Sequence, residues 1–218
     1  MIRKLALAAP LFLLHTTAAM AEGQSVSIKA GALGLGVEYG YDINERISVR
    51  GGLNGSHLGT DQEESGIDYN FDVIWDSLAA TFDFHPFKGP FRLSLGLLSN
   101  DNRVELESRA TGNVTVGDHT YTPQEVGTLL GKVGFDGTAT VAGVGWDWSR
   151  KHERFGTSLD IGVVDQGSPV ITLRGTGGLV GQPQFQADIA KEVAQLRDDL
   201  GDSVDLVPYL TFGFVFRF

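Results

Sequence analysis

The chain of 218 residues contains no cysteine, which excludes disulfide bonds and thiolate metal sites. It nowhere offers roughly 20 uninterrupted apolar residues, so no transmembrane helix is expected. Cations are also scarce: 17 lysines and arginines stand against 27 acidic residues, and this balance argues against nucleic acid as a partner. Proline is sparse at 7 residues, whereas glycine is frequent at 29. A chain of this length suits one domain.

The N-terminus has the pattern of a secretory signal. Arg3 and Lys4 precede an apolar stretch from Leu5 to Leu14, which is too short to span a bilayer as a helix. Ala19-Met-Ala21 then matches a small-residue cleavage site. We expect residues 1–21 to be removed and the mature chain, 22–218, to form one domain. The alternative is an uncleaved N-terminal anchor.

The last ten residues alternate between the two faces of an expected strand. One face carries Leu210, Phe212, Phe214, Phe216 and Phe218, and the other carries Thr211, Gly213, Val215 and Arg217. A final strand that is apolar on one face and ends in an aromatic residue is typical of outer-membrane β-barrels. The alternative is the edge strand of a β-sandwich. Within the barrel interpretation, Phe214, Phe216 and Phe218 are predicted to be the assembly signal that the barrel-insertion machinery reads.

Other segments also show period two and end in turn signals. They cover residues 33–42, 46–54, 67–84, 91–98, 133–148 and 155–174. Barrels of this type have an even number of strands, so we place an eighth strand at 24–30, before a tight turn at 31–33. The predicted fold is all-β: a transmembrane, antiparallel, up-and-down barrel of eight strands. A competing count treats Gly167-Ser-Pro169 as a hairpin turn.

The remaining segments are predicted to be loops, a bulge and one helix. Residues 56–66 and 102–132 are polar and irregular, and they predict long loops. The alternative for 102–132 is a loop with strand extensions. The apolar positions change parity near Asp76 and Ser77, which predicts a β-bulge there. Gln184–Leu200 has the spacing of a short amphipathic helix in a loop, packed on the barrel rim or acting as a lid. With Phe218 on the periplasmic side, the short turns lie there and the long segments lie outside.

The polar faces of these strands predict the barrel interior. An eight-stranded barrel is only wide enough to be filled by side chains or to hold one small ligand, and charges buried there must pair. We therefore expect a salt-bridge network, which either fills the barrel or lines a narrow gated path for small zwitterions or cations. The residues predicted to line it are Glu38, Arg46, Arg50, Asp72, Asp76, Arg92, Asp160 and Arg217.

No enzymatic signature is present. Ser56 and His57 place a candidate nucleophile beside a candidate base, but neighbours on a strand point to opposite faces. No nucleophile elbow, phosphate loop or clustered metal ligands appear. The acidic group of Asp61, Glu63 and Glu64 is interpreted as a solvated loop rather than a cation site. No catalytic residue, metal or cofactor is predicted.

The C-terminal third resembles the CarO family of small outer-membrane barrels. The resemblance rests on Gly167-Ser-Pro169 with Val170-Ile-Thr-Leu173, on Ala190-Lys-Glu192 with Leu196-Arg-Asp-Asp199, and on Pro208 before the final strand. It implies an eight-stranded barrel and a role in the uptake of small basic amino acids. No functional residue carries over from it.

The sequence therefore predicts a monomeric barrel in the bacterial outer membrane, in contact with membrane lipid and lipopolysaccharide. The leading functional hypothesis is porin-like, low-conductance passage of small polar solutes. The alternative is a closed structural barrel that stabilises the membrane or presents extracellular loops to partners.

Overall fold

The computed structural model describes residues 23–64, 67–135, 137–150, 154–200 and 205–218. The predicted signal peptide, residues 1–21, lies outside this range. In the described part of the chain, no helix is long and apolar enough to cross a membrane.

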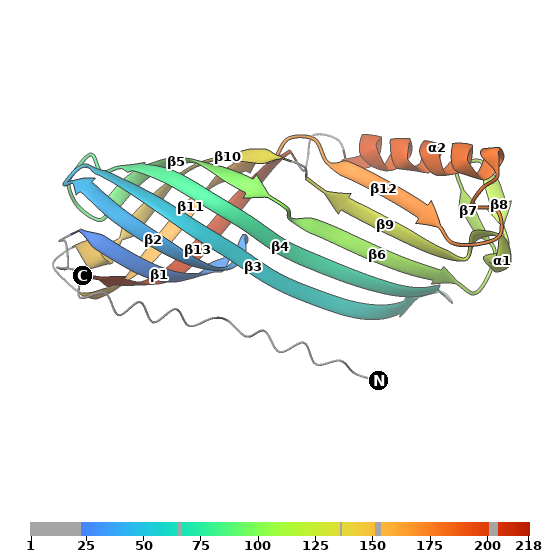
Figure 1. The fold of residues 1–218 in the computed structure, drawn as a ribbon, viewed down its shortest axis with the longest axis horizontal. Helices are drawn as coiled ribbons and strands as arrows, with labels where there is room; N and C mark the ends of the chain where they lie inside the picture. Colours follow the sequence, from blue (N-terminus) through green and yellow to red (C-terminus); the bar gives the residue numbers. More distant parts are fainter. Residues whose placement is uncertain (1–22, 65–66, 136, 151–153, 201–204) are drawn as a thin grey trace.

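Eight antiparallel strands form a closed barrel (Figure 1). They are β1 (Gln24–Gly31), β2 (Gly34–Asn44), β3 (Ile47–Glu64), β4 (Ile67–Phe84), β5 (Phe91–Asn100), β10 (Thr138–Asp147), β11 (Phe155–Asp165) and β13 (Leu206–Arg217). Each pairs with the next in this order, and β13 pairs with β1 to close the ring. The predicted eight-stranded up-and-down barrel is confirmed, including the inferred first strand.

A second sheet region extends beyond the barrel at the end away from the C-terminus (Figure 1). There β6 (Arg103–Ala110) pairs with the first half of β4, followed by β9 (Thr128–Gly134) and β12 (Val170–Gly175). With the second half of β3 these strands form the sheet extension, in the order β3-β4-β6-β9-β12. The predicted loop at 56–66 is therefore wrong over residues 56–64, and the segment 102–132 follows the alternative of strand extensions rather than one long loop. Their polar residues belong to strands that lie beyond the apolar band.

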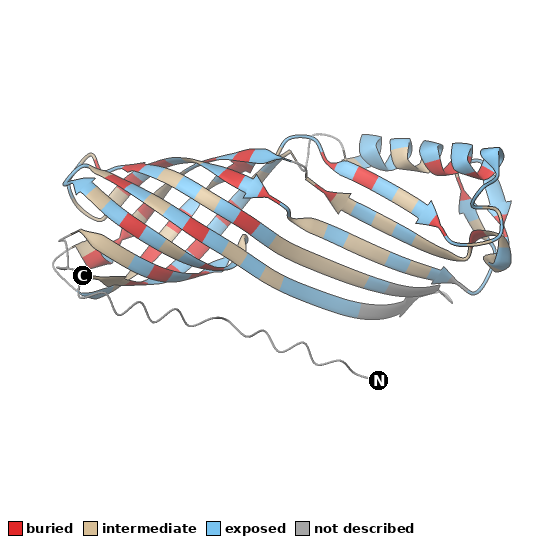
Figure 2. Ribbon diagram, viewed as in Figure 1, coloured by how far each residue is buried: buried red, intermediate tan, exposed pale blue. Residues whose placement is uncertain are grey.

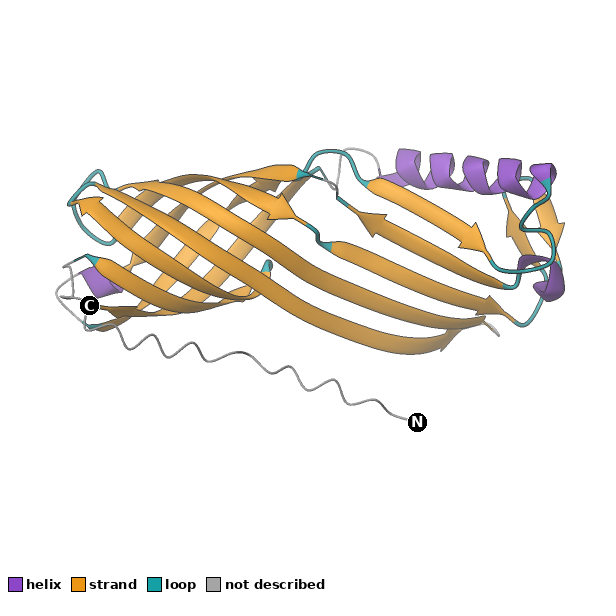
Figure 3. Ribbon diagram, in the orientation of Figure 1, coloured by secondary structure: helices purple, strands orange, loops and turns teal. Residues whose placement is uncertain are grey.

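The far end of the sheet extension carries the small elements (Figure 3). They are the hairpin of β7 (Val114–Val116) and β8 (His119–Tyr121) and the short helix α1 (Pro123–Val126). The 18-residue helix α2 (Pro183–Leu200) runs along the sheet extension beside β12 and reaches this end. A 3-10 turn, Trp148–Arg150, follows β10 at the opposite end of the molecule. One helix was predicted, and α2 matches it within one residue.

Helix α2 packs on the sheet extension rather than on the rim or across the mouth of the barrel. Phe185 and Ile189 are buried against Val116, Tyr121 and Val126. Asp188 fixes the helix to the β7–β8 hairpin, because its carboxylate accepts hydrogen bonds from the Tyr121 hydroxyl and from the backbone N–H of Asp118. The hydrogen bond from Tyr121 to this carboxylate raises the pKa of Tyr121 to about 12.

Strand β4 contains no bulge. It pairs with β3 without interruption from Phe84 opposite Ile47 to Ile67 opposite Glu64, so the predicted bulge at Asp76–Ser77 is wrong. The apolar positions of β4 switch from odd to even residue numbers because the environment of each face changes along the strand. In the barrel the outward face carries exposed Leu78 and Phe82. In the sheet extension it carries polar residues, since there it no longer faces lipid.

The segment from Phe155 to Arg174 is neither one long strand nor a hairpin. Strand β11 ends at Asp165 within the barrel, and β12 begins at Val170 within the sheet extension. Gly167-Ser-Pro169 lies in the link between them, and Gly167 adopts a φ of +68° that glycine accommodates without strain. The link lets the chain leave one sheet region and enter the other.

The barrel wall alternates between buried and exposed residues (Figure 2). On β13, Phe212 and Phe214 are 46% and 68% exposed, whereas Thr211 and Val215 are buried. The outward side chains are mostly large and apolar. Exposing such side chains to water would not stabilise a water-soluble barrel. This outward band indicates a lipid environment.

Candidate functional site

The centre of the barrel holds a six-residue ion-pair network, termed here the central cluster: Lys29, Glu38, Arg50, Asp83, Arg92 and Asp160. Asp160 lies 2.7 Å from Arg92 Nη2, 3.0 Å from Lys29 Nζ and 3.6 Å from Arg50 Nη1. Glu38 lies 2.7 Å from Lys29 and 2.9 Å from Arg50. Arg50 also donates to Asp83 Oδ1 at 2.9 Å. Three cations face three anions, so the cluster is neutral.

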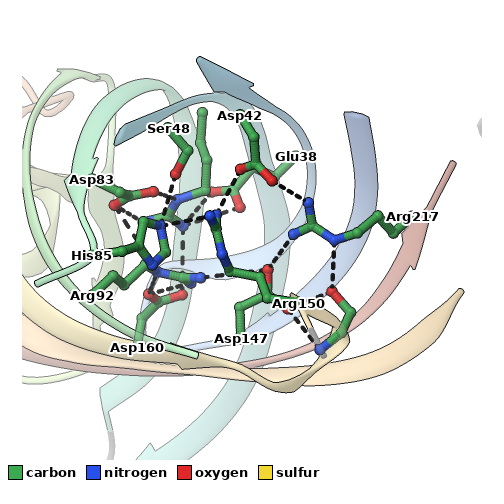
Figure 4. Close-up of polar contacts among 12 residues, drawn as sticks. Glu38, Asp42, Ser48, Asp83, His85, Arg92, Asp147, Arg150, Asp160 and Arg217 are labelled. Carbon is green, nitrogen blue, oxygen red and sulfur yellow. Dashed lines mark hydrogen bonds and ion pairs between the residues drawn. The ribbon is translucent and has the colours of Figure 1, made fainter. Parts of the chain in front are cut away.

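A second group of charges, the terminal cluster, fills the barrel end that carries the C-terminus (Figure 4). Asp42 accepts hydrogen bonds from Arg150 and Arg217, both at 2.6 Å. Arg217 also donates to Asp147 at 2.8 Å. Arg92 lies 3.9 Å from Asp147 and so connects the two clusters. Two arginines balance two aspartates, so this cluster is neutral as well.

His85 lies between the two clusters and is buried. Its Nδ1 lies 3.2 Å from the carbonyl oxygens of Gly89 and Phe91, so Nδ1 carries the hydrogen and donates. Its Nε2 then accepts from Ser48 Oγ at 3.0 Å and from Arg150 Nη1 at 3.1 Å. Burial and the Arg150 guanidinium lower the pKa of His85 below 6.5. The ring is held neutral at this end of the barrel.

The neutral His85 ring predicts a pH dependence of stability. An unfolded His85 takes up a proton near pH 6.5 whereas the folded ring resists it, so stability falls as the pH drops below 6.5. We expect the difference in unfolding free energy between pH 7.5 and pH 5.5 to shrink in a His85→Gln variant. Urea unfolding in detergent micelles measures it. The control is His119→Gln, an exposed histidine, and equal pH dependence of His85→Gln and wild type would refute the assignment.

An apolar layer covers the central cluster on the side of the sheet extension. It consists of buried Leu98, Ala139, Val141, Val164 and Tyr209, with Leu33 and Ala79 packed against them. Gly143 and Gly162 make room for the Tyr209 ring, because a Cβ on either would lie 2.8 Å from it. This layer separates the charged interior from the barrel end that carries the sheet extension.

A cavity of about 50 Å³ lies between the central cluster and the apolar layer. Lys29, Glu38 and Asp160 line one side, and Leu98 and Tyr209 line the other. This volume is enough for a few water molecules but far below the roughly 300–1,000 Å³ of small-molecule sites. The interior is therefore filled by side chains.

Five of the eight predicted lumen residues lie in the barrel interior, and three do not. Glu38, Arg50, Arg92 and Asp160 belong to the central cluster, and Arg217 belongs to the terminal cluster. The other three lie elsewhere, and this placement corrects the prediction. Arg46 is exposed because it precedes the first residue of β3. Asp72 and Asp76 lie on the outward face of β4, because the predicted bulge does not exist.

Sequence reasoning missed several charged residues of the interior: Lys29, Asp42, Asp83, Asp147 and Arg150. Alternation could have found four of them. Asp42 lies between Tyr41 and Ile43 on β2. Lys29 follows Ile28, Asp83 lies between Phe82 and Phe84, and Asp147 lies between two tryptophans. Each is a polar position flanked by apolar positions on the opposite face of the strand. Arg150 lies in a 3-10 turn and has no such signal.

The candidate nucleophile and base do not meet. Ser56 lies opposite Trp75 and His57 lies opposite Ile74, so the two side chains project from opposite faces of β3. His57 Nε2 instead lies 2.7 Å from Asp72 Oδ1. Among the described residues, no group of three or more histidines and acids could hold a metal ion. The side chains of Asp61, Glu63 and Glu64 lie outside the described part.

The closed eight-stranded barrel with its outward apolar band and filled polar interior has the fold of a small outer-membrane β-barrel. The chain is similar to CarO2 of Acinetobacter baumannii, with 16% identity, a TM-score of 0.61, and coverage of 90% of this chain and 99% of that chain. CarO of the same species matches with 15% identity, a TM-score of 0.60, and coverage of 91% and 98%. No protein-family model and no curated protein matches. The resemblance to CarO is confirmed for the fold.

Proposed function

We propose that this protein is a closed outer-membrane barrel that anchors an extracellular β-sheet and presents it to partners. The observation that carries the proposal is the filled interior. Leu98 and Val164 of the apolar layer are 0% and 1% exposed, and the charges beneath them neutralise one another. A static aqueous channel needs a wider, water-filled lumen than this.

The sheet extension supports the second half of the proposal. Its face on the side of the barrel interior carries apolar residues from several strands, and α2 covers only part of it. Leu58 on β3 remains 63% exposed and Val104 on β6 remains 39% exposed. Exposed apolar surface of this kind is typical of interaction sites. The export signal and the outward apolar band support the outer-membrane location.

Liposome swelling tests the closed state. Proteoliposomes that contain the folded wild-type barrel are expected to swell no faster than protein-free liposomes in small sugars and amino acids. Faster swelling of the wild type would contradict the proposal. Unchanged lipids after incubation with the barrel would separately support a non-enzymatic role.

A second candidate is the narrow passage of small polar solutes, including basic amino acids. One observation favours it: the 50 Å³ cavity is lined by charges of both signs, Lys29 and Arg50 against Glu38 and Asp160. In this case the apolar layer acts as the gate, and it must move for a solute to pass. The similarity to CarO agrees with this candidate but, at 16% identity, extends only to the fold.

The second candidate makes the apolar layer the gate, so in that case removing the layer is expected to open the barrel. A Leu98→Gly, Val164→Gly double variant should admit small zwitterions faster than the wild type in the swelling assay, because two buried side chains that block the lumen are gone. The control is Leu97→Gly, whose side chain is 57% exposed on the outward face. A folded double variant that stays as tight as this control would show that the layer is not the barrier.

A further inference from the structure

We propose that a pocket between the barrel wall and the sheet extension binds the phosphorylated headgroup of an outer-leaflet glycolipid together with a divalent cation. The pocket has a volume of about 440 Å³. Its lining includes Asp76 at the end of the barrel half of β4, Asp101 after β5, Arg103 on β6 and Lys132 on β9. Phe135 and Val170 form an apolar side.

The position of the pocket places it at headgroup level. Asp76 lies two residues beyond Leu78 on the same face of β4, and Leu78 is 56% exposed on the outward apolar band. On β5 the outward residue Leu97 is 57% exposed, and Asp101 follows four residues later. The pocket therefore opens where the apolar band ends, and lipid headgroups lie at that depth.

The charges in the pocket are not paired with one another. In the part of the chain that the structure describes, no ion pair or hydrogen bond is found for the Lys132 ammonium or for the Asp76 and Asp101 carboxylates. The backbone N–H of Asp76 donates to Asn102 Oδ1 at 2.8 Å. Arg103 donates its Nε to Glu105 at 2.8 Å and one Nη1 hydrogen to the Asp101 carbonyl at 3.3 Å, which leaves Nη2 available. An unpaired ammonium and two unpaired carboxylates thus face a single cavity.

This charge pattern fits a phosphate that carries a divalent cation. Lys132 and Arg103 are suited to phosphate oxygens, since charge-assisted hydrogen bonds to phosphate are strong. Asp76 and Asp101 offer hard oxygen ligands to Mg²⁺ or Ca²⁺, whose remaining ligands would be phosphate oxygens and water. A phosphate alone would be repelled by the two carboxylates. The apolar side at Phe135 and Val170 suits the lipid end of a headgroup. This inference does not depend on whether the lumen is closed.

Native mass spectrometry of the folded mature barrel in detergent provides the test, with purified lipopolysaccharide and Mg²⁺ as the probe. A Lys132→Met, Arg103→Met double variant should bind about ten- to a hundredfold more weakly than the wild type. An Asp76→Asn, Asp101→Asn double variant should lose a similar factor and become insensitive to EDTA, whereas EDTA should weaken wild-type binding. The matched control is Arg174→Met, an exposed cation on β12 outside the pocket, and it should bind like the wild type.

Two further binding measurements identify the ligand. Dephosphorylated lipid and inorganic phosphate with Mg²⁺ are each expected to bind at least about tenfold more weakly than the intact lipid. Equal binding of dephosphorylated lipid would reduce the site to an apolar lipid contact, and equal binding of inorganic phosphate would reduce it to an ion site. Either result overturns the proposal, as does wild-type affinity in both pocket variants. Heat-modifiable gel mobility confirms that each variant is folded.

Discussion

Replacing Asp160 with alanine is expected to lower the free energy of unfolding by about 3–5 kcal/mol. Asp160 is the anion that Lys29, Arg50 and Arg92 share, at 3.0, 3.6 and 2.7 Å. Its side chain is only 5% exposed, so bulk solvent screens these ion pairs little. Without it, three buried cations face only Glu38 and Asp83. Urea unfolding of the barrel in detergent micelles measures the loss.

The matched control for this variant is Glu105→Ala. Glu105 also pairs with an arginine, Arg103, but its side chain is 45% exposed in the sheet extension. An exposed pair contributes about 0–1 kcal/mol, so this variant should unfold nearly like the wild type. A loss for Asp160→Ala no larger than that of Glu105→Ala would show that the central cluster does not stabilise the barrel.

Replacing Phe218 with serine is expected to reduce the amount of folded protein in the membrane several-fold. The residue directly follows β13, the strand that closes the barrel between β1 and β11. Its backbone N–H donates to the Gln24 carbonyl at 3.0 Å, and its ring centroid lies 5.7 Å from that of Phe216. The predicted assembly signal of Phe214, Phe216 and Phe218 would lose its terminal aromatic residue. Quantitative immunoblotting of outer-membrane fractions measures the effect.

Phe87→Ser serves as the control for this assembly prediction. Phe87 is 78% exposed in a short turn at the same end of the barrel, outside any strand. Its replacement removes an aromatic residue of the same kind without touching the last strand. If both variants reach wild-type membrane levels, the terminal aromatic residue is not part of the signal.

The barrel itself could be predicted because its wall is amphipathic with period two. Each barrel strand separates lipid from a polar interior, so the alternation of residues such as Phe212 and Phe214 with Thr211 and Gly213 is strong. The same alternation identified Glu38, Arg50, Arg92, Asp160 and Arg217 as interior residues. Even the weak first strand followed, because the strand number had to be even.

The sheet extension could not be predicted in the same way. Its strands do not face lipid, so their outward face is polar. Residues 103–109 do alternate charged residues with Val104 and Leu106, a period-two signal that the prediction of a loop overlooked. The pairing of β6 with β4, and of β12 with β9, joins residues far apart in sequence and leaves no local signal. The wrong placement of Asp72 and Asp76 has the same origin. Where β4 leaves the lipid, its outward face changes from apolar to polar, and this change has the same sequence pattern as a β-bulge.

Single-channel conductance in a planar lipid bilayer tests the central claim, the closed lumen, most directly. The folded wild-type barrel is expected to give no resolved current steps in molar salt, because the apolar layer around Leu98 and Val164 lies across the lumen above a neutral ion-pair network. Steady, reproducible current steps from the wild type would contradict the closed barrel.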